Sequence, residues 1–264
     1  MRVVVEPHEA AAIANVAQRV ARALRRPGPC VLGLATGATM RPLYRELVRL
    51  HRERGLSFAR AETFNLDEYV GLGPDDPASF HFAMREHLFS KVDLDRGRAH
   101  LPDGRAAHPM REAAAYEGRI QAAGGIDLQL LGIGRNGHLG FNEPGSSLAS
   151  RTRVTALTVD TIEANRADLG PLPEPPLLAI TMGLGTILAA RACVLLALGE
   201  AKAAAVAQAI EGPVSAQAPA SVLQLHPDAT IVLDPPAASR LERCDQYFEA
   251  ESLQRALEAR FGED

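Results

Sequence analysis

Residues 126–147 constrain the fold more than any other stretch of the chain, because a strand pattern runs directly into a segment dense in glycine and polar side chains. Residues 126–131 are apolar almost throughout, which is typical of a strand buried on both faces. The polar side chains that follow are Asn136, His138, Asn142 and Glu143. Ligands of open α/β sheets bind outside the carboxyl ends of the strands, and polar groups this dense need partners or a ligand. We therefore interpret the stretch as a ligand site and not as a glycine-rich connection with one incidental histidine.

Part of this stretch matches the G-x-G-x-x-G pattern of dinucleotide-binding proteins. Gly132, Gly134 and Gly137 supply the glycines, and Asp160 lies downstream at about the distance of the acidic residue that binds the ribose. The pattern requires the third glycine to lead into an amphipathic helix. Here Pro144 would stop a helix within two turns. The sequence therefore argues against a nicotinamide cofactor.

Strand and helix patterns alternate along the chain. Expected strands cover residues 2–5, 30–35, 62–66, 126–131, 154–159, 178–182, 193–198 and 230–233. Expected helices cover residues 8–24, 42–54, 79–89, 111–123, 202–210 and 249–261. This alternation predicts an α/β fold with a mostly parallel sheet in three layers and helices on both faces. Because no linker or internal repeat is evident, we expect residues 1–264 to form one domain.

The composition narrows the classes of function. A formal net charge of −4, with 28 Lys and Arg against 32 Asp and Glu, gives no sign of a basic surface for nucleic acid. The three cysteines are far apart and form no C-x-x-C, so there is no metal or redox signature. No apolar run approaches the length of a membrane span or resembles a signal peptide. We expect a cytoplasmic protein without nucleic-acid or membrane partners.

A second constellation follows the expected strand at residues 30–35. Between this strand and a helix lie Thr36, Gly37, Ala38 and Thr39. Backbone N–H groups, hydroxyls and a helix N-terminus form a natural phosphate site, although the Gly-Lys-Ser/Thr of a Walker loop is absent. Lys202, at the start of another helix after a strand, is placed to meet a phosphate too. The alternatives are a tight turn capped by threonine and a solvated surface lysine.

Carboxylates mark two further positions. Asp67 and Glu68 follow the third expected strand, where one can serve as a general base and the other as a structural partner; the alternative is a helix N-cap. Farther along, His138 lies close in sequence to Asn136 and Glu143, an arrangement that orients and tunes an imidazole for proton transfer. The spacing fits no zinc signature and no second histidine is near, so we expect no metal.

Together these motifs closely resemble those of the glucosamine-6-phosphate deaminase family. The matching segments are LGLATGAT (residues 32–39), TFNLDEYVG (63–71), LGIGRNGHLGFNEP (131–144), SLASRT (147–152), LGEAK (198–202) and LQLHP (223–227). They cover nearly the whole chain in the same order. The G-H-x-x-F-N-E-P part is the most specific.

The resemblance implies a single Rossmann-like α/β domain without a cofactor or metal, acting on an amino sugar phosphate. The implied reaction converts D-glucosamine 6-phosphate and water to D-fructose 6-phosphate and ammonia. In it, His138 with Asn136 and Glu143 would open the pyranose ring, and Asp67 would move a proton from C2 to C1 through an enolamine. The implied phosphate-binding residues are Thr36, Gly37, Ala38, Thr39 and Lys202.

Three positions depart from the family pattern. Met40 stands where the phosphate loop usually has proline, so this loop lacks the restraint of a proline ring. Arg166 lies one position before the family's phosphate-binding arginine, and the resemblance implies that it contacts the phosphate. Thr155, two positions after Arg153, replaces the basic residue of allosteric relatives, which weakens the case for activation by N-acetylglucosamine 6-phosphate. Residues 165–177, rich in Pro, Gly and acidic residues, are expected to form a mobile lid.

Three other interpretations stand beside this one. A galactosamine-6-phosphate deaminase would carry the same motifs, because the shape of the pocket decides the epimer. The 6-phosphogluconolactonases share the sheet and a Gly-His element but lack the Phe-Asn-Glu-Pro of residues 141–144. A non-catalytic sugar-phosphate sensor would carry a DNA-binding module, whereas this chain opens on an expected core strand and keeps Asp67 and His138. Since the family forms monomers, dimers, trimers and hexamers, the sequence is compatible with a homo-oligomer.

Overall fold

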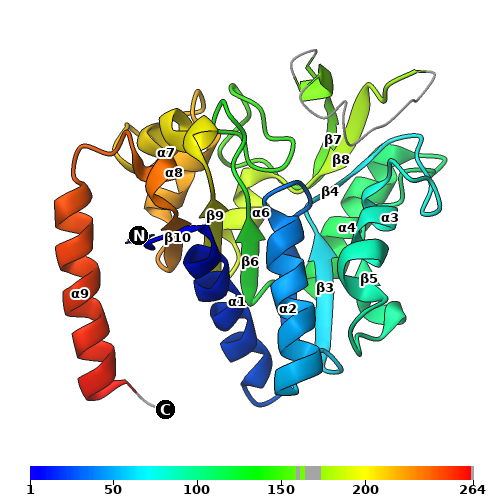
Figure 1. Cartoon of the computed structure of the whole chain (residues 1–264). Helices are drawn as coiled ribbons and strands as arrows, with labels where there is room; N and C mark the ends of the chain where they lie inside the picture. The colour runs from blue at the N-terminus through cyan, green and yellow to red at the C-terminus, as the bar shows by residue number, and fades with distance from the viewer. Residues whose placement is uncertain (159–160, 164–173, 263–264) are drawn as a thin grey trace.

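A parallel sheet of seven strands forms the centre of the molecule (Figure 1). The computed structural model describes residues 1–158, 161–163 and 174–262. The strand order is β1-β10-β9-β6-β2-β3-β5, and every neighbouring pair is parallel. The strands are β1 (Arg2–Val5), β2 (Cys30–Leu34), β3 (Ala61–Asn65), β5 (Ala99–His100), β6 (Leu128–Leu131), β9 (Ala192–Ala197) and β10 (Ala229–Leu233). The predicted α/β fold with a mostly parallel sheet is confirmed.

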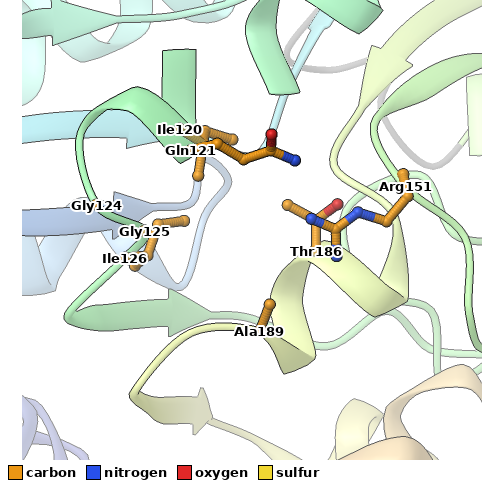
Figure 2. A pocket seen from close by; sticks show the side chains of 8 residues that line it. All are labelled: Ile120, Gln121, Gly124, Gly125, Ile126, Arg151, Thr186 and Ala189. Atoms are coloured by element: carbon orange, nitrogen blue, oxygen red, sulfur yellow. The ribbon is translucent and has the colours of Figure 1, made fainter. Parts of the chain in front are cut away.

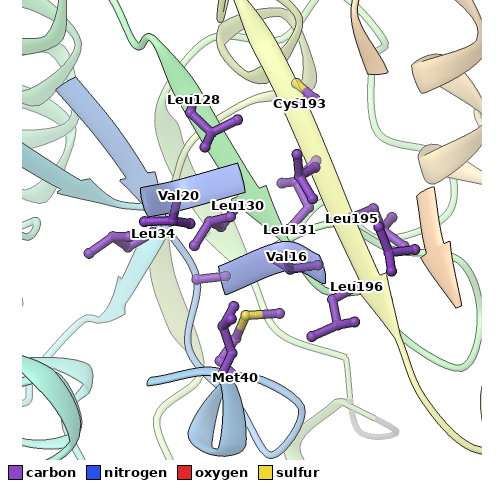
Figure 3. Packing of buried hydrophobic residues seen from close by; sticks show 14 of the residues in the cluster. Val16, Val20, Leu34, Met40, Leu128, Leu130, Leu131, Cys193, Leu195 and Leu196 are labelled. Carbon is purple, nitrogen blue, oxygen red and sulfur yellow. The ribbon is translucent and has the colours of Figure 1, made fainter. Parts of the chain in front are cut away.

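Helices surround this sheet (Figure 1). In α1, Ile13, Val16 and Val20 are buried along one side, as the helical spacing of the apolar residues predicts. Figure 3 shows Val16 and Val20 within the core together with Leu34 and Leu130 of the sheet. The helices are α1 (Glu9–Arg25), α2 (Met40–Arg54), α3 (Phe80–Met84), α4 (Pro109–Ala122), α6 (Leu184–Leu188), α7 (Ala203–Ile210), α8 (Pro235–Ala238) and α9 (Cys244–Phe261).

Several elements differ in extent from their predicted ranges. The helix expected at residues 79–89 is α-helical only as far as Met84 and continues as a π-helical turn at Arg85–Phe89. The last helix, α9, begins at Cys244 and not at residue 249. Outside the predicted elements lie β5 and short helical turns at Arg96–Arg98 and Pro219–Leu225. Elements this short carry too little periodicity to be recognised in a sequence.

A second sheet of three antiparallel strands stands beside the first (Figure 1). It contains β4 (Asp67–Tyr69), β8 (Leu178–Thr181) and β7 (Arg153–Ala156), in the order β4-β8-β7. The chain passes between the sheets at Leu66, whose N–H donates to the Leu34 carbonyl (2.9 Å) and whose carbonyl accepts from the Met182 N–H (2.7 Å). Because Asp67 begins a strand, the helix N-cap considered for it is wrong.

The strand order creates a switch point between β2 and β6. From β2 the chain continues outward to β3 and β5, then returns to place β6 on the other side of β2 and continues to β9. The carboxyl ends of β9, β6, β2 and β3 therefore follow one another along a single edge, which is where open α/β sheets bind ligands. Along this edge, β9 is followed by Lys202, β6 by residues 132–143, β2 by residues 36–39 and β3 by Asp67.

The remaining sequence expectations concern cysteines and membranes. Cys30 and Cys193 are buried thiols, and Cys244 is half-buried. None of the three forms a disulfide. Across the described ranges, no helix is long and apolar enough to span a membrane.

Candidate active site

The glycine-rich segment after β6 folds into a tight loop that presents His138. The Gly134 N–H donates to the His138 carbonyl (3.0 Å), and the Gly137 N–H donates to the Gly134 carbonyl (3.1 Å). The imidazole packs directly over Gly134, where an added Cβ would lie 2.3 Å from the ring. Glycine is therefore required for the ring to occupy this place. No helix occurs in residues 138–158, which agrees with the rejection of a dinucleotide site.

Glu143 is the anionic partner of His138. Its Oε1 lies 3.3 Å from His138 Nδ1 and accepts a hydrogen bond from Thr161 Oγ1, while its Oε2 accepts one from Asn136 Nδ2 (2.7 Å). Burial opposes the ionisation of Glu143, but these three partners outweigh it and lower the pKa of Glu143 to about 2. A permanent negative charge therefore faces the imidazole.

Two side chains hold this carboxylate in place. The Asn136 amide was expected beside the imidazole; it bridges instead from Glu143 to the backbone N–H of His138, which lies 3.3 Å from Asn136 Oδ1. Thr161 is 3% exposed, and its hydroxyl also accepts from Thr158 Oγ1 (3.0 Å). Thr161 was missed by the sequence reasoning, because no motif connects it with Glu143 across 18 residues.

Asp67, at the start of β4, is the second carboxylate of this edge. Its side chain is 5% exposed and makes no hydrogen bond with any residue in the described part of the chain. Asp67 Oδ2 lies 3.2 Å from the position that a Cβ at Gly140 would take, so the loop that carries His138 passes close to it. Burial, together with the neighbouring charge of Glu68, raises the pKa of Asp67 to about 8. A carboxyl group in this state is a strong base once it has lost its proton.

Glu68 has a structural role. Its fully buried carboxylate accepts hydrogen bonds from the backbone N–H groups of Phe80 (3.1 Å) and His81 (2.9 Å), and His81 Nδ1 lies 2.9 Å from it. These contacts fix the start of α3 against β4. Of the two adjacent carboxylates, Glu68 is thus held by the protein and Asp67 is left available.

Asn142 ties the loop to the second sheet. Its amide donates to the carbonyls of Leu139 (2.8 Å) and Met182 (2.7 Å), and its Oδ1 accepts from Arg153 Nη1 (2.7 Å). The side chain is fully buried and its contacts are all to the protein. Asn142 therefore positions its neighbour Glu143 without facing the edge itself.

The turn between β2 and α2 is exposed at its tip. Gly37 has a φ of 113°, a conformation that favours glycine, and its carbonyl accepts from the Met40 N–H (3.0 Å). Thr39 makes no capping hydrogen bond with its side chain, so the capped-turn alternative is wrong. The buried Met40 side chain packs against Gly132, where a Cβ would lie 3.6 Å from its methyl group. This contact anchors the turn at the position where the family has proline.

Two cations approach each other at the ends of β6 and β9. Burial, and to a lesser extent the charge of Arg135, lowers the pKa of Lys202. Neither cation forms an ion pair with a residue that the structure describes. Arg135 was missed by the sequence reasoning, although it lies inside the matching segment of residues 131–144. Two cations without a carboxylate partner suit an anion such as a phosphate group.

Arg166 and most of the expected lid at residues 165–177 lie outside the described residues, which omit 164–173. In the described part, no three or more His, Cys, Asp or Glu side chains are grouped to hold a metal ion.

Cavities elsewhere in the molecule are distinct from this edge. One of about 310 Å³ lies beside Ile126, which precedes β6 and so marks the amino end of that strand (Figure 2). Figure 2 shows Arg151, Gln121 and Thr186 around it. Another of about 230 Å³ is lined by residues that include His81 and Arg85.

Known proteins are similar to this chain over most of its length. Residues 6–232 match the family described as glucosamine-6-phosphate isomerases/6-phosphogluconolactonase. A glucosamine-6-phosphate deaminase of Hahella chejuensis is 48% identical over 247 residues, 94% of each chain. Another, of Rhodopirellula baltica, is 51% identical over 240 residues, 91% of this chain and 95% of the relative. The solved structure of a monomeric glucosamine-6-phosphate deaminase is 43% identical, with a TM-score of 0.88 over 91% of this chain and 100% of that one.

Proposed function

Because the chain belongs to the family of glucosamine-6-phosphate isomerases and 6-phosphogluconolactonases, we propose that it is a glucosamine-6-phosphate deaminase. The observation that carries the proposal is a buried carboxyl, Asp67, which has no hydrogen-bond partner among the described residues and lies beside the loop that holds the His138–Glu143 pair. Ring opening and proton transfer at C2 need two separate acid–base centres. Lactone hydrolysis involves no transfer from C2, so Asp67 favours a deaminase over a lactonase.

His138 and Glu143 are the proposed ring-opening pair. The pyranose opens when the anomeric hydroxyl loses a proton and the ring oxygen gains one, and an imidazole can carry that proton. Glu143, ionised down to about pH 2, stabilises the positive charge that His138 acquires during the transfer. Asn136 and Thr161 keep the carboxylate in position throughout.

Asp67 is the proposed base at C2. Removing the C2 proton of the open aldehyde forms a C1–C2 double bond, while the aldehyde oxygen takes up a proton, which gives an enolamine. Asp67 then returns its proton to C1, and the enolamine becomes an imine at C2. Water adds to this imine, and ammonia leaves to give the ketone of fructose 6-phosphate. Because no side chain in the described ranges forms a hydrogen bond with Asp67, its carboxyl can hold the proton between the two steps.

The turn of residues 36–39 is the proposed phosphate site. Its support is the pair of exposed N–H-bearing residues at the tip, Gly37 and Ala38, followed by the N-terminus of α2, a helix of 15 residues. Lys202 and Arg135 are proposed to supply positive charge from the neighbouring strands. Arg166 is retained as a proposed phosphate contact from its sequence position alone.

The decisive experiment compares ammonia release and fructose 6-phosphate formation from glucosamine 6-phosphate with the same assay on galactosamine 6-phosphate. Faster turnover of the galactosamine epimer would favour the alternative substrate. Binding of both sugars without release of ammonia would favour a sensor. Inorganic phosphate should compete with substrate, and equal turnover of unphosphorylated glucosamine would contradict the phosphate site.

Since a phosphorylated sugar does not cross a bilayer unaided, we propose that the protein works in the cytoplasm.

A further inference from the structure

The last helix, α9, stands at the edge of the molecule beside β1 (Figure 1). Only Glu251 of its 18 residues is buried. Large apolar side chains on α9 point instead into solvent, and four of the ten such exposed side chains in the described residues belong to this one helix. These four are Phe248, Leu253, Leu257 and Phe261.

Beyond its first turn, where Cys244 and Tyr247 pack against the core, the side of α9 that faces the protein is charged. Arg2 of β1 pairs with Glu251 (2.7 Å) and Glu258 (2.5 Å), and Arg255 pairs with Glu6 (2.8 Å). Partly exposed ion pairs stabilise a fold little, and most of the stability of a helix in a protein comes from packing of its apolar side. Helices of globular proteins normally bury their apolar side. The reversed polarity of α9 therefore indicates that its outer side is covered in the functional state.

Three outward residues form a continuous stripe, which we call the outer stripe of α9. Leu253, Leu257 and Phe261 follow one another at intervals of four residues, which places them along one side of the helix. Their exposed fractions are 61%, 53% and 68%. Glu249 and Arg260, both exposed and without an ion pair in the described residues, flank the stripe at its two ends.

We propose that α9 packs against α9 of a second copy of this chain, antiparallel about a two-fold axis that passes between Leu253 and Leu257. In that arrangement, Leu253 meets Leu257 of the second copy, and the reverse contact forms by symmetry. Phe261 lies over Ala250 of the second copy, and Glu249 faces Arg260. The stripe is thus complementary to itself in both shape and charge, as a two-fold interface requires.

The size of this interface sets its strength. In this register the two helices overlap from Glu249 to Phe261, about 20 Å of a helix about 10 Å wide, so the contact covers roughly 200 Å² on each copy, below the size of stable specific interfaces. We therefore expect association that depends on protein concentration. The match to the family ends at residue 232, before α9, so this contact lies outside the part of the chain that defines the family.

Sedimentation equilibrium of the full chain over a wide concentration range tests the proposal. The mass should rise from 28.2 kDa toward twice that value. Leu253→Asp should leave only monomer, whereas Met110→Asp, at an exposed apolar position on α4, should associate like the wild type. Glu249→Arg and Arg260→Glu should each raise the dimer dissociation constant about tenfold, and the combined variant should restore it.

The circular dichroism spectrum and kcat/KM should be unchanged in all these variants, because α9 lies on β1, three strands away from β6. Unchanged values would show that the variants fold. A wild type that stays monomeric at every concentration would overturn the proposal. So would a Leu253→Asp protein that still associates, because the interface would then lie elsewhere. A combined charge swap that fails to restore association would overturn the antiparallel arrangement.

Discussion

Asp67 and Glu143 are carboxylates at one edge of one sheet, yet their surroundings move their pKa values in opposite directions. Asp67 is buried without a described hydrogen-bond donor, beside the charge of Glu68, and its pKa rises to about 8. Glu143 is also largely removed from water, but Asn136 and Thr161 donate to it and His138 lies 3.3 Å away, and its pKa falls to about 2. The donors around each group, and not burial alone, decide the difference.

The contrast separates the two roles in the proposed reaction. A group whose pKa lies near the working pH can take and return a proton, and a group that is always ionised can only stabilise positive charge. Asp67 fits the first description and Glu143 the second. If the surroundings of Asp67 and Glu143 were exchanged, neither carboxylate should be able to perform its proposed role.

The largest expected effect is the loss of turnover in Asp67→Asn. The amide has the same shape but cannot accept the C2 proton, so kcat should fall by about 10²–10⁴-fold. Inhibition by inorganic phosphate should persist, since the phosphate site is untouched. In the wild type, kcat/KM should increase with pH up to about 8, as Asp67 loses its proton. Exchange of the C2 hydrogen with tritiated water measures the step directly, and a wild-type exchange rate in Asp67→Asn would assign the base elsewhere.

Glu143→Gln should have the next largest effect. An amide in place of the carboxylate removes the negative charge next to His138, so we expect kcat/KM to fall by about 10²-fold. The matched control is Asn136→Ala, which removes one hydrogen bond to Glu143 but leaves Thr161 and the charge in place. It should lose less than about tenfold. Equal activity of Glu143→Gln and the wild type would show that this carboxylate does not assist His138.

Much of the fold could be predicted from the sequence, because the strands of the parallel sheet are apolar runs bounded by glycine and proline. The same strands predicted which side chains stand at carboxyl ends, and the structure brings Asp67, His138 and Glu143 to one edge. The separation of a second sheet could not be predicted, although strands were expected at residues 154–159 and 178–182, where β7 and β8 lie. Its strand β4 has only three residues, and its pairing of Asp67 with Thr181 joins positions with no local pattern in common.

The hydrogen bonds within the site could not be predicted for a related reason. Sequence spacing places Asn136 close to His138, but the direction of its amide depends on where Glu143 folds back, which is set by the loop. Thr161 meets Glu143 only because the second sheet carries the chain past the loop. Such contacts arise from the tertiary fold, so a sequence motif identifies the chemical groups of a site but not their hydrogen-bond partners.

The ionisation of Asp67 and that of Glu143 should also have opposite effects on the stability of the fold, which can be measured without substrate. The pKa of Asp67 is raised from 3.8 to about 8 in the folded state, so its ionisation favours unfolding increasingly as pH rises from about 4 to 8. Asp67→Asn should therefore increase the free energy of unfolding at pH 8 by about 2–5 kcal/mol, and by less at pH 5. The pKa of Glu143 is lowered from 4.5 to about 2, so it stabilises the fold above pH 4.5 and loses this effect toward pH 2.

Glu143→Gln should accordingly lower the free energy of unfolding at pH 7, by about 1–3 kcal/mol. Urea titrations at pH 5, 7 and 8 measure both variants together with the wild type. If both substitutions shift stability in the same direction, the two carboxylates do not differ as their surroundings indicate.

The smallest expected effect is that of Asn136→Asp, which changes the surroundings of Glu143 and not those of Asp67. In Asn136→Asp, the donor that lies 2.7 Å from Glu143 Oε2 is replaced by a second carboxylate. Two carboxylates this close cannot both ionise readily, so one of them keeps a proton to higher pH and the pKa of Glu143 rises from about 2. Activity near pH 8 should change little, because the pair would still be ionised there.

At lower pH, two protons should then limit the reaction instead of one. For the wild type, the protonation of Asp67 should lower log(kcat/KM) as pH falls below about 8, and Glu143 should add nothing to this slope because its pKa is about 2. For Asn136→Asp the slope should be steeper than that of the wild type by up to about one below the raised pKa. The profiles are measured with correction for the substrate's own amino and phosphate groups, and Asn136→Ala serves as the control that adds no charge. The same slope in all three proteins would mean that Asn136 does not control the ionisation of Glu143.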